Sequence, residues 1–163
     1  MKDDHKKRIN LDFVALSAVV DASHASETRG SMSAVNLYFL DNLGRTHKVD
    51  LAIKEFSSAD NNEAEIKAIL FFLRKLGNKY KIIWLFTDSN RAAKLINGNH
   101  VNHKYQFLIS EIKELISKKK KMGSNIMIIK KPRSDEKIME VNSRLKLKRK
   151  AILVKSTSSN GKM

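Results

Sequence analysis

Apolar residues cluster along the chain in a pattern that predicts five strands. Residues 81–87 form a short continuous apolar run, which is typical of a strand covered on both faces. Residues 10–23 and 125–132 show similar runs that end in polar residues or proline. Two more apolar stretches lie within residues 33–53, on either side of Asp41-Asn42-Leu43-Gly44. Turn-forming residues between two such stretches indicate a β-hairpin.

Four helices are predicted from apolar residues spaced three or four positions apart. The first covers residues 57–77, with turn and cap residues at its start and a glycine as its stop. The others cover residues 89–97, 105–123 and 134–151. The elements therefore follow the order of three strands, a helix, a strand, two helices, a strand and a helix. This order favours an α/β fold in which a hairpin-first mixed sheet carries helices on its faces.

The length and composition are those of one globular domain. The chain has 163 residues, of which 42% are hydrophobic and 30% charged. We expect a flexible leader over residues 1–9, the domain over 10–151 and a disordered tail over 152–163. No apolar run approaches the roughly 18 residues that a membrane span needs, and the first residues lack the apolar core of a signal peptide. We therefore expect a cytoplasmic protein without membrane contact.

The net charge of +15 is concentrated in the second half of the chain. Residues 104–150 contain 15 Lys or Arg and 5 Asp or Glu, which amounts to +10 of the total. Such a bias favours a polyanion as partner, since neutralising phosphates releases condensed counterions. A lysine-rich composition bias of the source genome is the alternative explanation. Nucleic acid is the partner that the charge and its regional distribution favour.

Three carboxylates occupy similar places in the predicted fold. Asp21 lies near the end of the first strand, Glu65 in the first turn of the first helix, and Asp88 at the end of the fourth strand. Strand ends of an open α/β sheet are where sites form, and three converging acids would repel unless cations share the site. The chain contains no cysteine, so oxygen ligands and the hard ions Mg²⁺ or Mn²⁺ are favoured, with two ions acting on a phosphodiester. Each acid also has a purely structural explanation, as a turn residue, a helix-dipole partner or a helix N-cap.

Three motifs resemble type 1 ribonuclease H, in its compact form without the extended basic handle. They are "VVDAS", "NNEAEIKAIL" and "FTDSN", and the resemblance covers roughly residues 10–150 in order. It implies a ribonuclease H-like α/β fold, with a five-stranded mixed sheet of three antiparallel and then two parallel strands flanked by helices. It also implies metal-dependent hydrolysis of the RNA strand of RNA:DNA hybrids. Carried over by position, Asp21, Glu65 and Asp88 would be catalytic metal ligands.

The same resemblance implies contacts to the hybrid. Asn61, Asn62 and Asn90 match positions whose amides would contact the minor groove, where the 2′-hydroxyl groups distinguish RNA from DNA. The Lys and Arg residues of the basic half would hold the nucleic-acid backbone, among them Lys130, Lys131 and Arg133. We expect no obligate protein partner.

Some positions depart from the family pattern. Asp60 stands where the family has Thr, and Lys130 and Lys131 replace the histidine expected before Pro-Arg. The fourth metal ligand falls on Glu140 if the count from Pro-Arg has no gap, and on Asn142 if two residues are inserted. We take Glu140 as the fourth ligand, with Asn142 as the open alternative. These departures motivate a second hypothesis, a catalytically weak or inactive nucleic-acid-binding module of the same fold.

Overall fold

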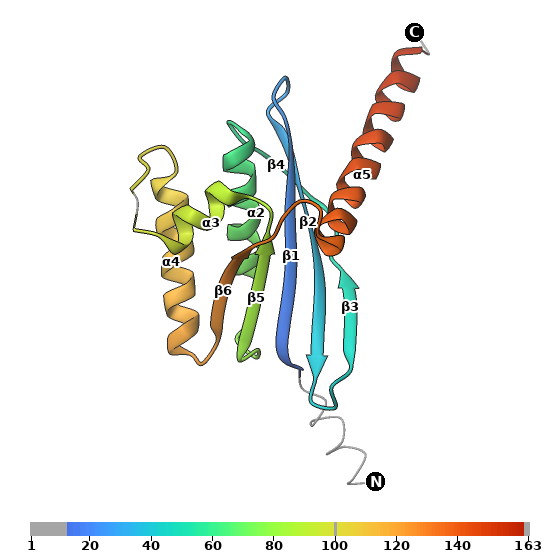
Figure 1. Cartoon of the computed structure of the whole chain (residues 1–163). Coiled ribbons are helices and arrows are strands. Elements are labelled where there is room, and N and C mark those ends of the chain that lie inside the picture. Colours follow the sequence, from blue (N-terminus) through green and yellow to red (C-terminus); the bar gives the residue numbers. More distant parts are fainter. Residues whose placement is uncertain (1–12, 100, 162–163) are drawn as a thin grey trace.

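The computed structural model describes residues 13–99 and 101–161, and its centre is a single mixed sheet (Figure 1). The main path of the sheet runs β3-β2-β1-β5-β6, and β4 pairs with β2 beside it. β1 is antiparallel to β2, whereas β1, β5 and β6 run parallel to one another. The strands are β1 (Phe13–Ala25), β2 (Gly30–Asp41), β3 (Thr46–Asp50), β4 (Lys54–Ser57), β5 (Ile82–Thr87) and β6 (Asn125–Lys130).

β3 and β4 together form one edge of the sheet, and this edge is interrupted between the two strands. β3 pairs with residues 36–40 of β2, and β4 pairs with residues 30–33 of the same strand. The predicted hairpin turn is present between β2 and β3, where Gly44 has a φ of 79° that glycine adopts without steric cost. The predicted mixed sheet of three antiparallel and two parallel strands is therefore confirmed, with β4 as an unpredicted continuation of the edge.

Helices of the described residues cover both faces of the sheet (Figure 1). Apolar residues of α2, α3 and α4 pack on one face in a core with Leu16, Ile83 and Leu85. On the other face, α5 places Ile138, Val141 and Leu145 against Val19, Met32 and Ala34 of β1 and β2. The helices are α2 (Asn61–Lys75), α3 (Asn90–Asn97), α4 (Gln106–Lys121) and α5 (Glu136–Gly161).

The last helix is longer than the sequence pattern indicates. A helix over 134–151 followed by a disordered tail is the expectation, whereas α5 continues to Gly161. No proline or glycine interrupts the chain between residues 134 and 160, and its serines and threonines lower helix propensity only slightly. The predicted end of the helix is thus corrected. The predicted leader over 1–9 and the last two residues of the tail lie outside the described residues.

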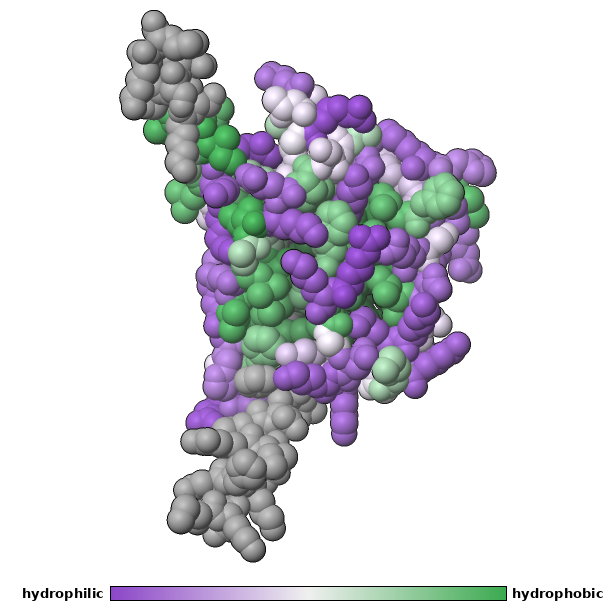
Figure 2. All heavy atoms as spheres, turned by 180° about the vertical axis from the view of Figure 1, so that it is seen from behind, coloured by the Kyte–Doolittle hydropathy of each residue, from purple (hydrophilic) through white to green (hydrophobic). Residues whose placement is uncertain are grey.

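The face behind that of Figure 1 carries an apolar pocket away from the strand ends. Figure 2 shows this face, on which apolar atoms reach the surface among polar ones. The pocket has a volume of about 450 Å³ and lies between α2 and β2, beside the break between β3 and β4, with Phe39, Phe72 and Tyr80 in its wall.

Over the described residues, no helix is both long and apolar enough to cross a bilayer.

Arg144 of α5 ties three backbone segments together. Its Nη1 donates to the carbonyl oxygen of Val35 at 3.2 Å and to Oδ1 of Asn36 at 2.5 Å, and its Nη2 donates to the carbonyl oxygen of Leu51. The guanidinium therefore joins α5 to β2 and to the break in the edge strand.

Replacing Arg144 by Met is expected to lower the free energy of unfolding by about 2–3 kcal/mol, since charged hydrogen bonds are lost and partly buried acceptors stay unpaired. Chemical denaturation measures this loss. Lys146→Met is the matched control, because Lys146 is exposed on the same helix. Equal stabilities of the two variants would contradict the proposed role of Arg144.

Candidate metal centre

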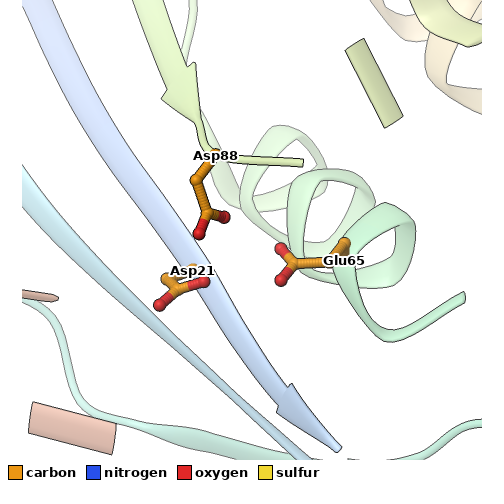
Figure 3. A group of neighbouring side chains, drawn as sticks. All are labelled: Asp21, Glu65 and Asp88. Atoms are coloured by element: carbon orange, nitrogen blue, oxygen red, sulfur yellow. The ribbon is translucent and has the colours of Figure 1, made fainter. Parts of the chain in front are cut away.

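The structure brings three of the predicted acids together (Figure 3). Asp21 lies in β1, Glu65 in α2, and Asp88 directly after β5. One carboxylate oxygen from each lies within 4.8 Å of the other two. These side chains come from parts of the sequence more than 20 residues apart, so the fold alone assembles them.

Sheet register explains why two of these acids meet. β1 and β5 are parallel neighbours, and Val19 of β1 pairs with Phe86 of β5. Two residues further along each strand, Asp21 and Asp88 are therefore side by side. α2 packs against β1 and begins at Asn61. Its buried Glu65 therefore points at the same end of the sheet as Asp21 and Asp88 (Figure 3).

Burial makes this group of acids electrostatically unfavourable without a cation. Asp21 and Glu65 are only 2% and 4% exposed. Burial, and secondly the charge of Asp88, raises the pKa of Asp21 to about 7. Burial, and secondly the charge of Asp21, raises the pKa of Glu65 well above its usual range. Protons or cations must therefore be bound here near neutral pH.

The carboxyl group of Glu65 also shows a missing partner. Its Oε2 is buried and has no hydrogen-bond partner. A buried polar atom without a partner is costly, and a divalent cation with oxygen ligands would remove that cost. The oxygen-only donor set and the orphaned oxygen together fit Mg²⁺ or Mn²⁺.

Arg133 supplies positive charge to the same site. Its Nε donates to Oδ2 of Asp88 at 3.1 Å, and its side chain is 77% exposed whereas that of Asp88 is 4% exposed. The nucleic-acid contact that the sequence predicts for Arg133 stays a prediction, and in the structure this exposed side chain also pairs with an acid of the site. One exposed guanidinium faces three carboxyl groups, so it offsets their repulsion only in part.

The other predicted nucleic-acid contacts lie at the starts of α2 and α3 and at the end of β6. Asn61 and Asn62 are exposed in the first turn of α2, and Asn90 is exposed as the first residue of α3. Lys130, at the end of β6, is exposed. Lys131 donates its backbone N–H to the carbonyl of Thr87 at 2.8 Å, and its Nζ lies 5.1 Å from the ring centre of Phe86. All five residues thus lie toward the end of the sheet that carries the acids. Their role in binding nucleic acid stays a prediction.

Glu140 does not join the three acids. Its carboxylate forms an ion pair with Lys48 of β3 and accepts a hydrogen bond from Oη of Tyr38 at 3.2 Å. The hydrogen bond from Lys48 holds the pKa of Glu140 below its usual value. Glu140, the fourth ligand expected from the sequence, thus lies apart from the three acids in this structure, because the rotation of α5 points it toward β3.

Asn142 lies on the opposite flank of α5. Seven residues are close to two helical turns, so Asn142 and Arg149 share one side of the helix. The Nε of Arg149 donates to Oγ of Ser23 at 2.8 Å, and Ser23 is two residues beyond Asp21 on β1. The Asn142 side of α5 therefore faces β1, the strand that carries Asp21.

Asp60 has a structural role that the sequence pattern did not reveal. It is the N-cap of α2 and accepts a hydrogen bond from the backbone N–H of Glu63 at 2.8 Å. Oη of Tyr105 donates to both of its carboxylate oxygens at 3.0 Å, and Nζ of Lys104 lies 2.5 Å from one of them. Asp60 thus caps the start of α2, and Lys104 compensates its charge.

Comparisons with known proteins give a fold but no close relative. No protein-family model matches the chain, and no curated protein matches it. Among solved structures, RNase H1 from the halophilic archaeon Halobacterium salinarum is 19% identical, with a TM-score of 0.56 over 74% of this chain and 87% of that one. LC11-RNase H1, isolated from compost by a metagenomic approach, is 17% identical, with a TM-score of 0.58 over 80% and 91%.

A third structure agrees with these two. The N-terminal RNase H domain of a Mycobacterium tuberculosis protein, solved as a fusion with maltose binding protein, is 19% identical, with a TM-score of 0.53 over 74% of this chain and 89% of that one. At these identities the likeness concerns the fold. The described chain therefore has the ribonuclease H fold, and it resembles type 1 ribonuclease H structures over most of its length.

Proposed function

We propose that the protein is a metal-dependent endonuclease that hydrolyses the RNA strand of RNA:DNA hybrids. The observation that carries the proposal is the group of Asp21, Glu65 and Asp88, whose carboxylate oxygens lie within 4.8 Å of one another at the strand ends of a ribonuclease H fold. The orphaned Oε2 of Glu65 supports a bound cation. Two solved structures that share the fold are RNase H1 structures, which makes hybrid cleavage the first activity to test.

The chain's own residues divide into ligands and substrate contacts. Asp21, Glu65 and Asp88 would hold two Mg²⁺ or Mn²⁺ ions, which when bound supply an activated water and stabilise the leaving oxygen. The backbone N–H of Ala22 donates to Oδ1 of Asp21 at 2.9 Å and so orients that carboxylate. The exposed amides at the starts of α2 and α3 would bind the minor groove of the hybrid, where its 2′-hydroxyl groups are displayed.

A cleavage assay on matched duplexes tests the proposal. The protein is expected to cut the RNA strand of a hybrid in Mg²⁺ or Mn²⁺, and to leave double-stranded DNA and double-stranded RNA of the same sequence intact. A chelator should abolish cutting. If metal-saturated protein leaves the hybrid intact, or cuts all three duplexes alike, the proposed substrate is wrong.

The position of Glu140 apart from the three acids favours a second candidate function, a catalytically weak or inactive hybrid-binding module. Without that residue the site has three carboxylates rather than four, which weakens the hold on one of two ions. This alternative predicts salt-sensitive hybrid binding that a chelator leaves unchanged, without turnover. Single-turnover assays at saturating metal separate the two candidates. A cytoplasmic location and the lack of an obligate protein partner stay predictions from the sequence.

Two substitutions on α5 test which residue is the fourth site group. Glu140→Gln is expected to leave cleavage within about threefold, since an exposed ion pair is worth little. Asn142→Asp is expected to lower the Mg²⁺ concentration for half-maximal cleavage by about tenfold, because one more carboxylate attracts the ions. Metal titrations of the two variants beside the unchanged protein measure both effects. A larger change in Glu140→Gln than in Asn142→Asp would contradict the assignment.

A further inference from the structure

The outer part of α5 carries positive charge that nothing in the described protein neutralises. Lys146, Lys148 and Lys150 are exposed, and Arg149 is partly buried. None of the four forms an ion pair within the described residues, and the chain contains no Asp or Glu after Glu140. We call residues 146–150 the α5 basic segment. Its repulsion disfavours a helix unless anions bind there.

Arg149 fixes this segment beside the acids. Its Nε donates to Oγ of Ser23, two residues beyond Asp21 on β1, whereas its Nη2 is buried without a hydrogen-bond partner. Arginine presents its N–H donors in a fork that matches phosphate oxygens. Arg149 therefore places a partly buried guanidinium next to the site, and the protein leaves one of its donors without a partner.

Helical geometry extends this contact outward from the site. Lys146, Arg149 and Lys150 follow Asn142 by four, seven and eight residues, so all four share one side of α5. The distance from Asn142 to Lys150 along the axis is about 12 Å, which corresponds to about three phosphates of one strand. Figure 1 shows α5 running beside the last part of β1 and past the end of β5.

The second lysine cluster of the chain lies at the other end of the sheet. Lys118–Lys121 form the last turn of α4, which leads into the start of β6. Because β6 is parallel to β5, its start is opposite to the end that carries Asp88. Lys119 is buried and donates to the carbonyl oxygen of Leu76 at 2.5 Å, so it has a structural role. The basic half of the chain is thus split between two ends, and the α5 basic segment lies at the acid end.

We propose that the α5 basic segment is a second nucleic-acid contact, which binds backbone phosphates of the hybrid beyond the cleavage site. This inference rests on the proposed function, because it takes a nucleic acid as the substrate. The contact is electrostatic and independent of base sequence. It lies on the C-terminal helix of a chain that resembles the family form without a basic handle.

Binding measurements on two charge-matched triple variants test the proposal. Lys146→Gln/Lys148→Gln/Lys150→Gln removes the lysines of the segment, and Lys118→Gln/Lys120→Gln/Lys121→Gln removes the same charge at the far end. Both are made in the full chain with Asp88→Asn, so that hybrid is not consumed. The first variant is expected to bind hybrid at least about tenfold more weakly in 0.1 M salt, and to lower the slope of log Kd against log salt concentration by about 2 to 3. The second should change neither by much.

Arg149→Met distinguishes a phosphate contact from a structural role. It is expected to lower the salt slope by about one, whereas Ser23→Ala, which removes only the hydrogen bond within the protein, should leave the slope unchanged. Arg149→Lys should restore most of the slope. If Arg149→Met and Ser23→Ala lose thermal stability alike and leave the slope alone, the arginine is structural and the contact is overturned.

The outcomes separate this inference from the proposed function. Equal binding losses in the two triple variants, or no loss in either, overturn the α5 contact while hybrid cleavage by the unchanged protein still supports the proposed function. Absence of any nucleic-acid binding overturns both. Leu147 and Val154, both 68% exposed on the same helix, fit a protein partner instead. Unchanged hybrid binding by the α5 triple variant would favour that occupant.

Discussion

Replacing Asp88 by Asn is expected to lower hybrid cleavage by on the order of 10³-fold, while the protein still folds and binds hybrid. Asp88 is the acid that the register of β1 and β5 places beside Asp21, and its carboxylate is almost fully buried. The amide keeps the shape of the side chain and removes its charge. Metal ions held at the site would lack one carboxylate ligand, and with it part of the stabilisation that they would give to the negative charge of the phosphate in the transition state. Single-turnover rates at saturating Mg²⁺ measure the loss.

Glu140→Gln is the matched control for this experiment. It makes the same chemical change in a carboxylate that pairs with Lys48 and lies apart from the acid group. Circular dichroism and hybrid binding of both variants verify that they fold. If the Asp88→Asn variant cleaves the hybrid at an undiminished rate, the proposed mechanism loses its basis, whatever the result with Glu140→Gln.

The second large effect concerns stability without metal, which is expected to fall as the pH rises toward neutrality. The pKa of Asp21 is about 7 in the folded protein, against an ordinary value of 3.8, and burial is the main cause. Between these two values the folded state holds a proton that the unfolded state has released, so the free energy of unfolding decreases with increasing pH. The shift corresponds to at most about 4 kcal/mol. Above pH 7 this contribution is fully lost.

Asp21→Asn should reduce this dependence, and the part that arises from the raised pKa of Glu65 should remain. At pH 8 without metal, the variant is expected to be more stable than the unchanged protein by about 1–3 kcal/mol, because a buried charge is gone. Mg²⁺ at a hundred times its Kd should stabilise the unchanged protein by about 2.7 kcal/mol and leave the variant nearly unaffected. Urea unfolding at pH 5 and pH 8, with and without Mg²⁺, measures both quantities.

Glu27→Gln serves as control for the stability experiment, because Glu27 is an exposed carboxylate in the β1–β2 loop. It should leave both the pH dependence and the Mg²⁺ effect unchanged. A metal-free protein that gains stability between pH 5 and pH 8, after correction by this control, would show that Asp21 is ionised in the folded state at lower pH than the structure indicates.

The candidate site shows which features can be predicted from the sequence pattern alone. Asp21 and Asp88 each end a buried apolar run, and strand ends of such a sheet converge, so their meeting follows from the order of elements. The position of Glu65 in the site follows from the start of its helix at the same end of the sheet. Glu140 and Asn142 differ in a way that no spacing resolves, because both lie on one helix whose rotation depends on the packing of Ile138, Val141 and Leu145 against β1 and β2.

The roles of charged side chains were equally hidden in the linear pattern. Asp60 acquires Tyr105 and Lys104 from a segment more than 40 residues away. Arg133 meets Asp88, and Arg149 meets Ser23, through contacts between elements distant in the chain. Long side chains reach several Å from their backbone, so their partners depend on which elements lie beside them.

The sequence by itself determined the type and order of the strands and helices apart from β4, the hairpin at Asp41–Gly44 and the three acids of the candidate site. These features depend on local periodicity, turn chemistry and the polarity at strand ends, all of which act over a few residues. Only the tertiary structure decided the rotation of α5, the separation of Glu140 from the acids and the division of the basic residues between two ends of the sheet. Those features depend on packing between distant elements, because the burial of apolar faces sets the direction of every neighbouring side chain.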